Sequence, residues 1–156
     1  MWLEKEPKDL YPNTVAGAMI DLVSDNEEGY AADFFEQDIV LNGNDILASE
    51  RIQERPIALF HVEYVEGLDM NPAYQKNIVR VKVRIANHNP RHVEEQQQEA
   101  IVLAQRVRSR LQGALIEVPD ASAANIEIVS AVDEEINEVQ LAVYKFTAQV
   151  THTYQP

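Results

Sequence analysis

Several stretches in the second half of the chain alternate apolar and polar residues, which is the pattern of a β-strand with one buried face. The clearest is 77–86, NIVRVKVRIA, where branched apolar residues alternate with basic ones. The stretch 57–65, IALFHVEYV, alternates in a similar way, and a loop around residues 67–72 separates the two. Residues 58–86 therefore predict two strands of one antiparallel sheet.

Two further strands are predicted nearer the C-terminus. The first runs from Ile126 to Val132 and the second, longer one from Val139 to Tyr154. An acidic turn at 133–137 is predicted between them. In the longer strand the alternation indicates one packed face and one face in water.

Two stretches show the three- and four-residue apolar spacing of amphipathic helices. The longer runs from Arg91 to Gln112, with glutamates near its start and arginines near its end, and Gly113 is placed to cap it. The shorter runs from Asn13 to Ser24. We expect the buried stripe of the shorter helix to comprise Val15, Ala18, Met19, Leu22 and Val23. In the longer helix the stripe comprises Val93, Gln97, Ala100, Ile101, Ala104, Val107 and Leu111.

These elements predict an α+β fold, in which an antiparallel four-stranded sheet packs against one long helix and an additional N-terminal helix completes the chain. The 156 residues form one domain, since a chain of this length can bury one core without disulfides or metals. Three segments follow one another: the N-terminal helix (1–25), an acidic loop or insertion (26–55), and the sheet-and-helix core (56–156). The middle segment has no clear period, and either two short strands at 39–41 and 46–48 or a long loop with apolar anchors fits it.

Composition removes several classes of function. Cysteine is absent, so disulfides, thiolate nucleophiles and cysteine-based zinc sites are excluded. We expect no export signal and no membrane span, because the start of the chain lacks a basic segment followed by an apolar run and no stretch approaches roughly 18 apolar residues.

The net charge of −13 is concentrated in residues 1–55, which carry thirteen acids against four bases. This balance argues against tight binding of nucleic acid. It is compatible with a surface that DNA passes without sticking, but a solvated acidic face that aids solubility is the favoured interpretation.

The sequence gives only weak signals for catalytic or metal-binding residues. His88 and His92 are the only histidines close in sequence, but Pro90 disfavours helix at Asn89, so the pair is expected to straddle a turn rather than bind a metal. The paired acids fall in turns or in the first turn of a helix, where solvated caps are expected. No phosphate loop, G-x-S-x-G or H-E-x-x-H is present. We therefore expect no enzyme and no cofactor; a small-ligand domain or enzyme with a pocket between residues 26–50 and the sheet is the less favoured alternative.

Three features on outward faces remain unexplained by the core. The row Arg80, Lys82 and Arg84 is either a solvated face or a surface that meets acids on a neighbouring copy, because like charges side by side on a sheet repel unless something opposes them. Val102 projects from the outer face of the long helix. With the acidic turn these form a candidate subunit interface: Arg80, Lys82, Arg84, Val102, Asp133, Glu134 and Glu135.

Four segments carry a resemblance to a known family. They are RPIALFHVEY, NIVRVKVRIA, EEQQQEAIVLAQRVRSRLQG and IVSAVDEEINEVQLAVYKFTAQVTHTY, within residues 55–154. Their order of two strands, a long helix ending in basic residues, a strand, an acidic turn and a long closing strand resembles the tail-terminator and neck proteins of tailed bacteriophages.

The resemblance implies a structural protein of the virion that assembles in the host cytoplasm. Such a protein forms a homohexameric ring on the end of the tail tube, stops tube growth and offers a surface to the head connector, while DNA passes through without specific binding. Its partners would be copies of itself, the tail tube protein and the head-connector or neck protein. Another neck or tail-completion protein of related fold is the alternative.

Overall fold

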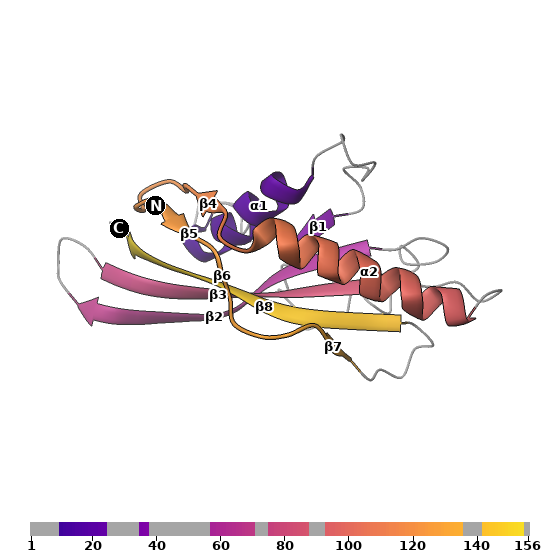
Figure 1. Ribbon diagram of the computed structural model, residues 1–156. Coiled ribbons are helices and arrows are strands. Elements are labelled where there is room, and N and C mark those ends of the chain that lie inside the picture. The colour runs from indigo at the N-terminus through magenta and orange to yellow at the C-terminus, as the bar shows by residue number, and fades with distance from the viewer. Residues whose placement is uncertain are drawn as a thin grey trace.

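The computed structural model describes residues 10–24, 35–37, 57–70, 75–87, 93–135 and 142–154. Their elements, in chain order, are α1 (Tyr11–Val23), β1 (Phe35–Gln37), β2 (Ile57–Met70), β3 (Gln75–Asn87), α2 (Val93–Leu111), β4 (Leu115–Ile116), β5 (Ala124–Asn125), β6 (Glu127–Ile128), β7 (Asp133–Glu134) and β8 (Ala142–Tyr154). Figure 1 shows a sheet with both helices on one side of it.

The sheet is larger than the four strands expected from the sequence. Its strand order is β1-β2-β3-β8-β6, and β7 also pairs with β8, which gives six strands in the described part of the chain. All pairs are antiparallel except the pair of β1 with β2. The mixed class of helices and antiparallel sheet is confirmed, whereas four strands against one helix was too simple, since α1 also contributes to the core.

The core lies between the helices and one face of β2, β3 and β8, which we call the inner face. The register places Phe60, Val83 and Phe146 side by side across the three strands. All three are buried, as are Ala100 and Ala104 of α2, which runs over β3 and β8. Small residues at these positions let the helix approach the sheet closely, which dense packing requires.

Both predicted helices are present, but their bounds and their buried residues differ from the prediction. The longer begins at Val93 among the described residues and ends at Leu111, and Gly113 has the positive φ of 76° expected of its cap. Its stripe runs through Gln96 rather than Gln97, which is exposed. The other buried members are Ala100, Ala104, Val107 and Leu111.

The shorter helix starts two residues earlier than predicted, because Pro12 occupies its first turn, where a missing N–H costs nothing. Leu22, expected in its buried stripe, is 39% exposed, and Ala16 is buried instead. The stripe is rotated because α1 packs against both the sheet and α2.

Strand β2 continues through the expected loop at 67–72 as far as Met70. It can do so because two bulges interrupt its register with β3, between Val62 and Tyr64 and between Gly67 and Asp69. A bulge adds one residue to one strand and reverses the alternation beyond it. Val65 is consequently opposite Val79 of the inner row.

Of the predicted strand from Ile126 to Val132, only Glu127–Ile128 form a strand, β6, and a second short strand, β7, lies at the start of the predicted acidic turn. Glu127 and Asp133 are six residues apart, whereas their partners on β8, Gln149 and Lys145, are four apart. The extra residues leave the edge of the sheet between β6 and β7. Asp133 and Glu134 are therefore edge-strand residues rather than turn residues.

Of the segment 26–55 the structure describes only β1, which pairs in parallel with Ala58–Phe60 of β2. The sequence did not predict this strand. The possible strands at 39–41 and 46–48 lie outside the described residues, as do His88 and His92.

A polar cluster attaches the start of α1 to the end of the sheet. Tyr11 forms a hydrogen bond with Nε2 of His152 and stacks on Tyr154, with 3.8 Å between ring centroids. His152 and its cross-strand partner Asn77 are only 3% and 4% exposed, although both are polar. At the other end of α1, Arg110 of α2 donates to the carbonyl of Val23 at 3.0 Å. Polar contacts thus fix the helix at both ends.

Burial lowers the pKa of His152 below its ordinary value of 6.5, because the buried site disfavours the charged imidazolium. The unfolded chain takes up a proton near pH 6.5 and the folded chain does not. The stabilising effect of neutral His152 is therefore complete above about pH 6.5 and is lost as the pH falls below it.

We expect the free energy of unfolding to fall by at most about 1.4 kcal/mol per pH unit through this group as the pH falls below about 6.5. In His152→Gln, which keeps a hydrogen-bonding side chain but does not titrate, this part of the pH profile should be flatter. Urea denaturation of both proteins at several pH values measures the difference, and equal slopes would contradict the assignment.

Candidate interaction surface

The face of the sheet turned away from the helices, which we call the outer face, carries the basic row. Arg80, Lys82 and Arg84 alternate along β3 with the buried inner valines, as predicted. The register places Gln149 and Lys145 of β8 opposite Arg80 and Arg84. Four cationic side chains could therefore repel one another on adjacent strands unless acids lie between them.

Glu135 is such an acid, and it comes from the same chain. Arg84 donates from Nε and Nη2 to Oε2 of Glu135 at 3.0 and 2.6 Å, and Nζ of Lys82 lies 3.3 Å from Oε1. The backbone N–H of Glu135 donates to the carbonyl of Val143 on β8 at 2.8 Å, which fixes the residue at the sheet edge. From the sequence, we expected the basic row to face either solvent or acids of a neighbouring copy. For Lys82 and Arg84 the structure instead provides an acid of the same chain.

The Glu135 side chain is only 14% exposed. Burial alone would raise its pKa, but the hydrogen bonds and positive charges of Arg84 and Lys82 outweigh burial and hold the pKa below the usual 4.5. The carboxylate is therefore charged at neutral pH and stabilises the fold. By linkage this contribution is present above about pH 4.5 and is lost as the pH falls below that value.

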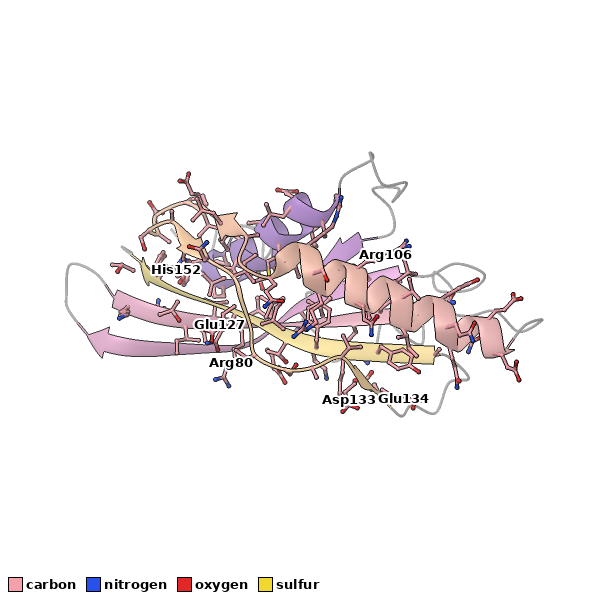
Figure 2. All side chains as sticks on the ribbon, in the orientation of Figure 1. Arg80, Arg106, Glu127, Asp133, Glu134 and His152 are labelled. Atoms are coloured by element: carbon pink, nitrogen blue, oxygen red, sulfur yellow. The ribbon has the colours of Figure 1, made fainter. Side chains whose placement is uncertain are left out.

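Arg80 belongs to a second chain of contacts, which crosses β3, β8 and β6 and whose two ends, Arg80 and Glu127, are labelled in Figure 2. Its Nε donates to Oε1 of Gln149 at 3.1 Å, and Nε2 of Gln149 donates to Oε2 of Glu127 at 3.0 Å. Glu127 and Gln149 were not predicted as members of the surface. Only the pairing of β6 with β8 brings them beside Arg80.

Asp133 and Glu134 are exposed on β7, at the edge of the sheet (Figure 2). Asp133 pairs with Lys145 of β8, and its Oδ1 accepts the backbone N–H of Glu134 at 3.0 Å. The two carboxylates remain accessible to solvent. Six of the predicted residues thus share one surface, the sheet surface, made of Arg80, Lys82, Arg84, Asp133, Glu134 and Glu135.

One end of the outer face is itself buried. Leu59, Ala86 and Val143 lie on β2, β3 and β8 at this end, and none of them has exposed surface. The exposed charge of Arg80 lies towards the other end. The accessible sheet surface is consequently smaller than the alternation alone indicated.

A cavity of about 410 Å³ opens on the outer face where the chain leaves β8 between β6 and β7. Lysines and carboxylates of opposite charge line it, and Oγ of Ser130, another lining residue, already accepts the backbone N–H of Thr147 at 2.7 Å. The lining residues are Glu63, Lys82, Ser130, Ala131, Val132, Asp133, Lys145, Phe146 and Thr147. The pocket weighed in the ligand hypothesis involved residues 26–50, of which only β1 is described.

Val102 lies on the other layer of the molecule, on the solvent side of α2, and is 44% exposed. It is one of the residues that line a shallow hollow of about 410 Å³. We call this the helix surface; its residues are Gln98, Glu99, Val102, Leu103 and Arg106. The predicted interface residues therefore divide between two separate surfaces.

No protein-family model matches the chain, and no curated protein matches its sequence. Within the described ranges there is no cluster of three or more potential metal ligands. Neither described helix is both long enough and apolar enough to cross a membrane.

We expect Glu135→Gln to lower the free energy of unfolding by about 1–2 kcal/mol at pH 7, because two cations lose their partly buried counter-charge. The loss should shrink as the pH falls below about 4.5 and should vanish once the wild-type carboxylate is protonated as well. Glu134→Gln, an exposed neighbour, is the matched control and should change stability by less than about 0.5 kcal/mol. Chemical denaturation measures both, and equal effects of the two substitutions would contradict the role of Glu135.

Proposed function

We propose that this chain is a ring-forming tail terminator of a tailed bacteriophage, which caps the tail tube and joins it to the head connector. The observation that carries the proposal is the order of the long elements: two antiparallel strands, a helix with a basic end, and a closing strand. These elements make up the greater part of the order on which the resemblance of the sequence rests. In this role the protein assembles in the host cytoplasm and ends in the neck of the virion.

The charge of the chain supports this role. A ring around a DNA channel must let the polyanion pass without holding it, and a protein with a net charge of −13 repels phosphates. The internal pairing of Lys82 and Arg84 with Glu135 reduces the positive charge offered to DNA further.

A ring of six copies needs a contact between two different patches of the subunit, since only such heterologous contacts close into rings of this kind. The sheet surface offers two patches of opposite charge. Arg80 lies opposite Gln149 and Asp133 opposite Lys145, four residues further along β8, which corresponds to roughly 13 Å. In the proposed ring, Arg80 of one copy meets Asp133 and Glu134 of the next.

The assembled state of the purified protein tests the proposal. We expect hexameric rings in negative-stain images and in mass measurements at high concentration, and we expect the protein to limit tube length when it is added to growing tail tubes. A strict monomer that also fails to bind tube ends would overturn the proposal.

Arg80→Glu tests the contact itself. Arg80 is exposed, and Gln149 keeps Glu127 as a partner, so the variant should fold like the wild type but lose its rings. Arg106→Glu makes the same change of charge on the other layer and should keep them. Thermal unfolding verifies that both variants are folded. Rings that survive Arg80→Glu would place the ring contact away from the sheet surface.

A further inference from the structure

The solvent face of α2 carries a stripe of side chains that the core and the proposed ring leave unused. Glu95, Glu99, Val102, Arg106 and Ser109 recur at spacings of four, three, four and three residues, and all are exposed. This spacing is that of a seam along which two helices pack. Val102, the apolar member, stands at its centre.

The charges on this stripe are ordered along the helix. Acids occupy the N-terminal half and arginines the C-terminal half. The helix dipole explains charges in the first and last turns, but its effect fades within one turn. Glu99 and Arg106 lie further in than that, on either side of Val102. The exposed charge of the stripe therefore changes sign at Val102, from Glu99 on one side to Arg106 on the other.

We infer that the helix surface binds a second copy of this chain through a two-fold contact, in which two α2 helices lie antiparallel and Val102 meets Val102 of the other copy. Reversing one helix about Val102 brings Glu99 level, within one residue, with Arg106 of the other copy. Because the contact is two-fold, the pair of Glu99 with Arg106 of the other copy forms twice. A parallel arrangement would oppose acid to acid and base to base, and the two helix dipoles would repel.

Self-complementarity distinguishes a second copy from other occupants. An acidic or a basic peptide would match only half of the helix, whereas an antiparallel α2 matches both halves. The Glu99 carboxylate is already held in place, because Nδ2 of Asn87 donates to its Oε2 at 3.0 Å. A preordered side chain loses less freedom on binding. The hollow around Val102, with half-buried Leu103 beside it, gives the valine of the other copy a place to pack.

This contact is separate from the one proposed to close the ring. A two-fold contact joins identical patches and ends at two copies, and it uses the helix layer rather than the outer face of the sheet. It would pair subunits, or join two rings face to face. With one valine at its centre the pairing is weak, and it should weaken further as salt screens the exposed charges.

A charge-exchange experiment tests the inference on the full chain. Glu99→Arg and Arg106→Glu should each weaken self-association about tenfold or more, because each sets like charges opposite one another. An equimolar mixture of the two variants restores both pairs and should associate at least as tightly as the wild type. A fluorescently labelled variant is titrated once with the same unlabelled variant and once with the other variant, and the two affinities are compared. Ring contacts are common to both titrations and therefore do not account for a difference between them.

Matched controls complete the test. Glu117→Arg changes the charge as Glu99→Arg does but lies beyond α2, and it should associate like the wild type. Val102→Asp should abolish the pairing without changing the thermal unfolding midpoint. A mixture no tighter than the separate variants, or wild-type pairing by Val102→Asp, would overturn the inference.

Discussion

The pairing of β3 with β8 is the constraint on which the rest of the structure depends. The two strands are in register from Gln75 opposite Tyr154 to Asn87 opposite Ala142. A slip of one residue would turn every apolar side chain of one strand towards the opposite face, so the buried rows hold the register strongly. With this register the apolar residues of both strands form the inner face, on which α2 packs. The register also places Asn77 opposite His152 near α1, and it leaves the basic row on the outer face.

Charges on the outer face are governed by that register together with the short edge strands. Because β7 pairs with the edge of β8, Glu135 lies close enough to form ion pairs with Arg84 and Lys82 of β3, which is on the other side of β8. A partly buried cation pair without this acid would be costly, so the chain neutralises most of its own basic row. On this face Arg80, Asp133 and Glu134 are exposed, and the proposed ring contact uses their charges.

The two layers of the molecule then divide the proposed contacts between them. The sheet layer carries separated patches of opposite charge, as a heterologous ring contact requires, and the helix layer carries one patch that is complementary to itself, as a two-fold contact requires. Neither surface is strongly apolar, since the apolar residues of α2 and of the long strands are largely used in the core. Association through either surface should therefore be specific in geometry, moderate in strength and sensitive to salt.

The sequence by itself determined the elements whose signal is local: the alternation in β3 and β8, the helical stripe and glycine cap of α2, and the outward direction of Arg80, Lys82, Arg84 and Val102. It could not determine the bulges that extend β2, the splitting of the strand after Ile126, or the parallel strand β1, because these depend on which residues of another strand lie opposite. For the same reason it left the partner of the basic row open. Arg84 and Glu135 are 51 residues apart in the chain, and only the tertiary structure, by laying β7 along β8, decides that they meet.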